Sequence, residues 1–144
     1  MRIGIDCTAA AHQRAGIGRY TRGIVGALAR LGGEHSFALI VAGGEGEAGG
    51  FDARGVGLEI ADNFRIRTLP LSPRFWTTIW HRLHMPLPVD LMLGSVDVFH
   101  SPDYVLPPLR RGKTLVTIHD LSFLRYPEGA EPNLGGYLST AVPR

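Results

Sequence analysis

The residues from Ile3-Gly-Ile-Asp-Cys7 to Phe37-Ala-Leu-Ile-Val-Ala42 contain two apolar segments with a helix pattern between them. The apolar side chains from Ile17 to Leu31 recur at spacings of three and four residues, the period of an amphipathic helix. Gly32-Gly33 then ends the pattern, as glycines do at helix C-termini. The second segment is apolar throughout, which is typical of a strand buried on both faces of a parallel sheet. The order therefore predicts a β-α-β unit.

Three further segments, 64–68, 96–100 and 114–118, have the composition of strands. The first alternates apolar and polar residues, which favours a position at a sheet edge with one face in water. A second helix is expected from Pro73 to about His84, before two prolines interrupt the chain. Strands alternating with helices predict the α/β class and a doubly wound parallel sheet.

Composition excludes several classes of protein. The chain has 144 residues, of which 44% are hydrophobic, and this composition excludes a disordered tail. Its formal charge of +2 is too small to indicate nucleic-acid binding. Its single cysteine, Cys7, excludes an intrachain disulfide and favours a reducing compartment. The N-terminus lacks the apolar core of a signal peptide, and no apolar run reaches the 18 or so residues of a membrane span. We expect a cytoplasmic protein.

The chain is expected to form a single domain over residues 1–144. The span Gly43 to Gly57 holds seven glycines, and we expect a mobile loop there, at about 43–57. Residues 136–144 resemble the opening of another helix with no closing strand after it, which predicts that the chain is a fragment.

Polar residues gather where the predicted strands end. Asp6 and the loop Thr8–Gly18 follow the first strand, His100-Ser-Pro-Asp103 the fourth, and His119-Asp120 the fifth. Doubly wound sheets bind ligands outside the carboxyl ends of their strands, so we expect these groups to share a cleft. The alternative is that strand ends are simply where solvent begins.

The loop Ala15-Gly-Ile-Gly-Arg19 leads into the first helix. Glycines allow close approach of the backbone, and a helix N-terminus offers free N–H groups, an arrangement that suits a phosphate or diphosphate. The dinucleotide fingerprint is incomplete, because the position of its third glycine is not glycine and no acidic residue follows Ala42. A nicotinamide cofactor is therefore disfavoured, and a plain turn stays open as an alternative.

Two further features have both a functional and a structural interpretation. The His81-x-x-His84 pair, or a cluster of acidic and histidine residues at the strand ends, could hold a metal, but neither has a recognised ligand pattern and we expect no metal. The segment 74–84 is basic and aromatic, which is compatible with peripheral membrane contact through a Trp76–Trp80 helix. The same two tryptophans have the spacing of core residues.

Four stretches together resemble the N-terminal domain of the group 1 (family 4) retaining glycosyltransferases. They are Ile3-Gly-Ile-Asp6, Ala15-Gly-Ile-Gly-Arg-Tyr-Thr21, Asp97-Val-Phe-His-Ser-Pro102 and Thr117-Ile-His-Asp-Leu121. The likeness covers most of the chain and is strongest at residues 1–31 and 96–128. It implies a GT-B architecture, in which two Rossmann-like domains face each other across a cleft. This chain would be the N-terminal, acceptor-side half.

The resemblance also implies an activity. The family transfers a hexose from a nucleotide-sugar donor to a glycan or lipid-linked acceptor, with retention of configuration and no required metal or other cofactor. Its donor is held by a C-terminal domain with an E-x7-E motif, which these 144 residues do not contain, so the chain alone is expected to be inactive. Stabilisation of the leaving group would supply most of the rate.

Site residues follow position by position from the same resemblance. Gly16, Gly18 and Arg19 would belong to the loop that reaches the donor diphosphate. His119 would be the catalytic cleft histidine that contacts the donor sugar. The acceptor side would be formed by His100, Asp103, Tyr104 and Asp120. The alternative function is a non-catalytic Rossmann-like module that binds a glycan, a nucleotide or a protein. The sugar, the nucleotide, the linkage and the oligomeric state stay open.

Overall fold

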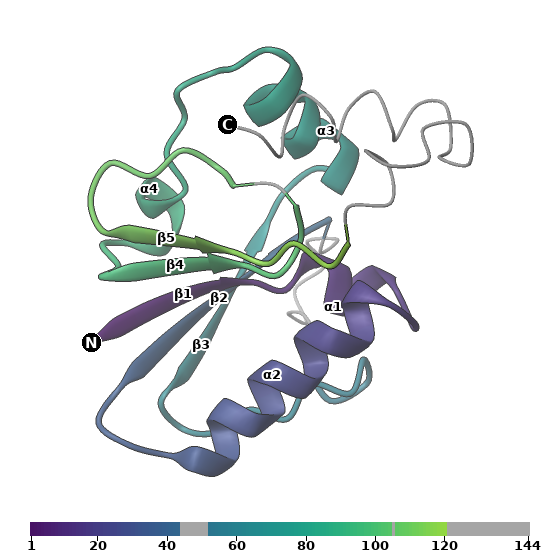
Figure 1. Cartoon of the computed structure of the whole chain (residues 1–144), viewed down its shortest axis with the longest axis vertical. Coiled ribbons are helices and arrows are strands. Elements are labelled where there is room, and N and C mark those ends of the chain that lie inside the picture. Colours follow the sequence, from purple (N-terminus) through teal and green to yellow (C-terminus); the bar gives the residue numbers. More distant parts are fainter. Residues whose placement is uncertain (44–51, 105, 121–144) are drawn as a thin grey trace.

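A computed structural model describes residues 1–43, 52–104 and 106–120 of the chain. The elements follow one another as strand β1 (Arg2–Asp6), helices α1 (Thr8–His12) and α2 (Ile17–Leu31), strands β2 (Ser36–Ala42) and β3 (Phe64–Leu69), helix α3 (Pro73–Thr77), the π-helical turn η1 (Thr78–Arg82), helix α4 (Asp90–Leu93), and strands β4 (Val98–Ser101) and β5 (Lys113–Val116) (Figure 1).

The strands form one parallel sheet in the order β3-β2-β1-β4-β5 (Figure 1). From β1 the chain adds β2 and β3 on one side and then β4 and β5 on the other. The boundary between β1 and β4 is therefore the switch point of a doubly wound sheet. All five strands predicted from the sequence are present, with bounds within two residues of those expected, and β3 lies at an edge as its alternating pattern predicted. The described chain therefore has a Rossmann-like α/β fold.

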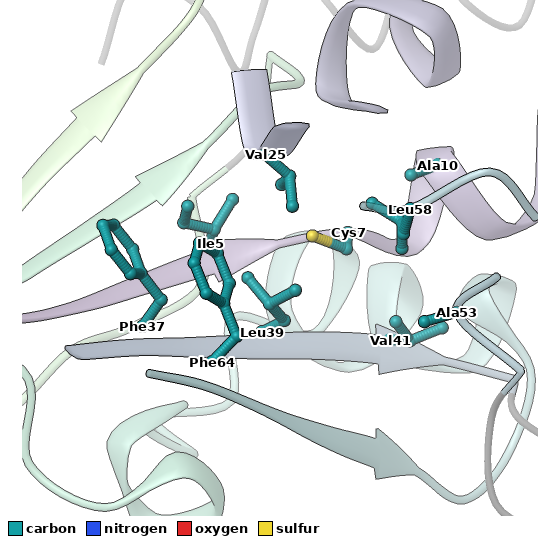
Figure 2. Close-up of a cluster of buried hydrophobic side chains, with 10 residues drawn as sticks. All are labelled: Ile5, Cys7, Ala10, Val25, Phe37, Leu39, Val41, Ala53, Leu58 and Phe64. Carbon is teal, nitrogen blue, oxygen red and sulfur yellow. The ribbon is translucent and has the colours of Figure 1, made fainter. Parts of the chain in front are cut away.

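Helices cover both faces of the sheet. On one face, α1, α2 and the turn around Ala53 pack on β1, β2 and β3, forming the core cluster drawn in Figure 2. On the other face, α3, η1 and α4 pack on the alternate residues of the same strands, with Phe99 of β4 at 0% exposure. Because successive side chains of a strand point to opposite faces, β2 contributes Leu39 to the first core and Ile40 to the second.

Helix α2 has the predicted bounds, but the face that it buries lies next to the apolar stripe predicted from the sequence. Thr21 and Val25 are fully buried against the sheet, whereas Tyr20 is 38% and Leu31 79% exposed. The close-packed face is formed partly by small residues, which a search for large apolar side chains passes over. The displacement leaves Tyr20 and Ile24 on a shallow surface beside the carboxyl end of the sheet.

Two short helices were not predicted. Residues Thr8–His12, which we expected to be a loop, form α1, because four or five residues are too few for a periodic apolar pattern. Helix α4 is anchored by its buried first residue, Asp90, whose carboxylate accepts hydrogen bonds from the amide and Nε of Arg110 at 3.2 and 3.1 Å.

The two tryptophans of the basic, aromatic segment lie in the core. The helix predicted from Pro73 to about His84 is α3 followed by η1, which ends at Arg82. Trp76 and Trp80 are 7% and 9% exposed, and their indole N–H groups donate to the carbonyls of Pro70 and Leu87. The core interpretation of their spacing is confirmed, since both side chains face the sheet.

Residues 52–57 of the glycine-rich span form a turn with one buried residue. Ala53 is 7% exposed and belongs to the first core cluster, as does Leu58, which directly follows the span and is 1% exposed. Asp52 accepts a hydrogen bond from the amide of Gly55 within it. Residues 44–51 of the expected mobile loop, and the C-terminal residues 136–144, lie outside the described residues. Within the described ranges, no helix has the length and apolar character that crossing a membrane requires.

Candidate functional site

A cavity of about 420 Å³ opens at the carboxyl end of the sheet, between the α1–α2 region and α3. Its volume falls in the range of about 300–1,000 Å³ typical of small-molecule sites. The lining combines apolar and polar side chains from β1, β2, α1, α2, α3, η1, β4 and the segment after β4, among them Asp6, Thr8, Trp76, Trp80, Asp103 and Tyr104. The cavity thus lies where ligands of doubly wound sheets bind.

Asp6 occupies the end of β1. It pairs in register with Ile40, and this register turns its side chain to the face covered by α3. One carboxylate oxygen accepts the amide N–H of Thr8 at 2.8 Å. Burial raises the pKa of Asp6; the hydrogen bonds from Thr8 oppose this effect, and the negative charge of Asp103 adds to it. The resemblance had assigned Asp6 no role, although its place at a strand end was a usable signal.

Two of the four predicted acceptor-side residues line the cavity. Asp103 and Tyr104 follow β4, and the Asp103 carboxylate accepts the amide N–H of Tyr104 at 2.7 Å. The Tyr104 hydroxyl donates to a carboxylate oxygen of Asp120 at 3.4 Å. Burial raises the pKa of Tyr104, and the charge of Asp120 contributes. Asp120 is thereby held beside the cavity without being part of its lining.

His100, the fourth predicted acceptor-side residue, points to the opposite face of the sheet. It pairs in register with Ile5, which belongs to the first core cluster, and it does not line the cavity. Its Nε2 is hydrogen-bonded to the Thr117 hydroxyl at 2.9 Å, and burial lowers the pKa of the imidazole. The predicted residues therefore divide between the two faces.

His119 lies past the end of β5, next to the cavity. Its Nε2 is 2.8 Å from the carbonyl oxygen of Pro102, and because a carbonyl only accepts, Nε2 carries the proton. A neutral His119 ring therefore keeps Nδ1 as an acceptor. The ring is exposed and meets the edges of Tyr20 and Tyr104 at centroid distances of 4.8 and 5.9 Å. Pro102 and Tyr104 both line the cavity, so His119 is one contact away from it.

The two glycines of the predicted phosphate loop differ in their surroundings. Gly16 is the N-cap of α2 with φ +57° and ψ −127°, a conformation that glycine adopts easily, and a Cβ built there meets no atom within 4 Å. Gly18 is buried in the first turn of α2, where a Cβ would lie 2.6 Å from the carbonyl oxygen of Ala9 and against that of Gln13. Gly16 is thus open to a ligand, whereas Gly18 allows α2 to pack closely on α1.

Arg22 organises this loop and was not singled out from the sequence. Its guanidinium donates to the carbonyls of Ala10, Gln13 and Arg14 at 2.6, 2.8 and 2.7 Å. These carbonyls belong to the last turn of α1 and to the start of the loop. A cation at the C-terminal end of α1 also interacts favourably with the dipole of that helix. Arg19, which was predicted to belong to the loop, is exposed and lies on the shallow surface beside Gly16.

Tyr20 and Thr117 connect the two parts of the site. The Tyr20 hydroxyl lies 3.3 Å from the Thr117 hydroxyl, which is also bonded to His100, while the Tyr20 ring packs on His119. Helix α2 is thereby joined to the ends of β4 and β5. Both residues lie in the motifs quoted above, but the sequence alone showed no interaction between them.

The acidic and histidine residues of the strand ends do not assemble as metal ligands. Asp97 lies at the other end of β4, where its carboxylate accepts the amide N–H of Arg2 at 2.7 Å. Among the residues that the structure describes, no three or more His, Cys, Asp and Glu side chains are grouped as a metal ion would need.

Comparisons with known proteins give no match. A scan against protein-family models, a search of curated proteins and a search of solved structures each found nothing similar.

Proposed function

We propose that this chain is the N-terminal, acceptor-side domain of a nucleotide-sugar-dependent retaining glycosyltransferase, which transfers a hexose to a glycan or lipid-linked acceptor. The supporting observation is the position of His119. It packs on Tyr20 of the glycine loop on one side and bonds to Pro102 of the cavity wall on the other. A transferase needs its two substrates to meet, and a histidine between a phosphate-type loop and a small-molecule cavity suits that task.

The chemistry follows from the groups present. Gly16 and the first N–H groups of α2 would approach the donor diphosphate, where a positive helix end favours negative charge. His119 would bind the donor sugar close to the reacting carbon, with Nδ1 toward a hydroxyl. We also propose that a second domain binds the donor and that the reaction requires no metal or other cofactor.

The proposed location is the cytoplasm. Peripheral membrane contact through the Trp76–Trp80 segment would have to use its exposed apolar side chains, Phe75 and Leu83, because both indoles are buried. Such contact would bring the domain close to lipid-linked acceptors.

The test uses the protein as its gene encodes it, after the coding sequence downstream of Arg144 has been read. Release of nucleoside diphosphate from UDP- and GDP-hexoses is measured with a panel of glycan and lipid-linked acceptors. We expect a second β-α-β domain with paired glutamates, acceptor-dependent turnover, and a loss of at least about 100-fold in kcat for His119→Ala. His35→Ala is the matched control, because His35 is exposed and lies before β2, at the far end of the sheet.

Two results would overturn the proposal. One is a stop codon after Arg144 together with a native mass of 15.6 kDa, which would favour the non-catalytic binding module. The other is undiminished turnover of a folded His119→Ala enzyme.

A further inference from the structure

Two indole rings belong to the apolar part of the cavity lining. Trp76 and Trp80 pack against each other with ring centroids 4.9 Å apart, and both line the cavity. Their N–H groups are already bonded to the carbonyls of Pro70 and Leu87. What these rings present to the cavity is therefore carbon, a surface suited to the C–H groups of a ring-shaped ligand.

The polar part is acidic. Among the described lining residues the carboxylates are Asp6 and Asp103, no lysine or arginine is present, and His12 is the titratable base. His12 is bonded through Nε2 to the carbonyl of Ala42, which fixes its ring at the rim. A carboxylate has about four acceptor positions, so Asp6 can accept ligand hydroxyls in addition to its bonds from Thr8.

We propose that this cavity binds a neutral, hydroxyl-bearing ring of the acceptor and discriminates against the same ring carrying a phosphate, with Asp6 and Asp103 as the specificity-determining residues. This inference rests on the proposed function and narrows its acceptor class. Hydroxyls donate to the two carboxylates, while the C–H face of the ring packs on Trp76 and Trp80. A phosphate would be a second anion in a partly desolvated site already occupied by carboxylates, where like charges repel strongly.

The experiment measures binding to the protein as its gene encodes it, without donor. Trp76 and Trp80 both line the cavity, so intrinsic tryptophan fluorescence reports on it. The probes are methyl hexopyranosides of the gluco, manno and galacto series, each compared with its 6-phosphate. We expect at least one neutral glycoside to change the emission saturably, and its 6-phosphate to bind at least about tenfold more weakly, a difference of about 1.4 kcal/mol.

Asp6→Asn is the decisive variant. It removes the charge at nearly constant shape, so we expect weaker binding of the neutral glycoside and a smaller difference between glycoside and phosphate. Asp62→Asn, at an exposed position in the turn before β3, is the matched control and should match the parent chain. If Asp6→Asn does not fold by circular dichroism, Asp103→Asn serves in its place, with the same expected result.

Each outcome decides a different point. Phosphorylated and neutral rings that bind equally, saturation by neither, or discrimination unchanged in both variants would overturn the inference. If transfer activity and its dependence on His119 persist in that case, the proposed function stands and only its acceptor class is wrong. Discrimination by the cavity without any transferase activity in the encoded protein would leave a neutral-sugar site and refute the catalytic proposal.

Discussion

Replacing Gly18 with alanine is expected to destabilise the domain, while the same replacement at Gly23 is expected to stabilise it. Both glycines lie in α2, so both replacements gain the better helix propensity of alanine, about 1 kcal/mol. They differ in what the new methyl group meets. At Gly23 a Cβ has no atom within 4 Å, whereas at Gly18 it lies 2.6 Å from the Ala9 carbonyl oxygen.

The magnitude follows from the nature of the obstacle. The atoms facing Gly18 belong to the backbone of α1 and of Gln13, so they cannot move aside as a flexible side chain would. Overpacking of this kind costs about 1–3 kcal/mol. Subtracting the shared propensity gain leaves Gly18→Ala between neutral and about 2 kcal/mol destabilised, and Gly23→Ala about 0.5–1 kcal/mol stabilised. The difference between the two variants isolates the clash at about 1–3 kcal/mol.

Urea unfolding followed by far-UV circular dichroism measures this difference, and melting temperatures should differ by roughly 2–4 °C per kcal/mol in a domain of this size. A Gly18→Ala variant as stable as Gly23→Ala would refute the packing role. The comparison thus tests the structural role of Gly18 before any substrate is known.

Two further predictions concern the surroundings of the site. Arg22→Met removes three charge-assisted hydrogen bonds from the loop, so amide hydrogen exchange at residues 13–16 should accelerate and the free energy of unfolding should fall by about 1–3 kcal/mol. Arg19→Met, at an exposed position, should change neither quantity. Equal exchange rates in the two variants would refute the role of Arg22. Burial lowers the pKa of His100 below its ordinary 6.5, so the unfolded chain takes up this proton at a higher pH than the folded chain, and the contribution of His100 to the free energy of unfolding falls as pH decreases through 6.5. His100→Asn should flatten this dependence in urea titrations at several pH values, and an unchanged slope would contradict the assignment.

Strands could be predicted from the sequence because their signal is local. Phe37–Ala42 is an unbroken apolar run between Ser36 and Gly43-Gly44, and the helices that cover both faces of the sheet bury its two faces. The buried face of α2 could not be predicted in the same way. Three of its four buried residues are Gly18, Thr21 and Gly26, which are small and carry little hydrophobic signal, so the large apolar residues pointed to a neighbouring stripe.

The site could be predicted only in part, because strand ends identify an edge but not a face. His100 and Asp103 are three residues apart and share the same edge, yet the register of β4 against β1 turns His100 toward the α2 side while Asp103 lines the cavity. That register depends on pairing across almost the whole chain. Asp6 was predicted to lie at this edge but was given no role, because only the structure shows that it lines the cavity.

The division of the edge into two faces gives the site a direction. On one side of this division lie Gly16, Tyr20 and the N-terminus of α2, surroundings suited to anions; on the other lies the acidic cavity between α1–α2 and α3, which is proposed to disfavour them. One molecule with both a diphosphate and a neutral ring could contact both sides. Two substrates, one anionic and one neutral, could each occupy the side that suits its charge and meet at the boundary. His119 stands at that boundary, in contact with Tyr20 and with Pro102. The proposed separation of charge preference on either side of His119 therefore supports the proposed group transfer over simple binding.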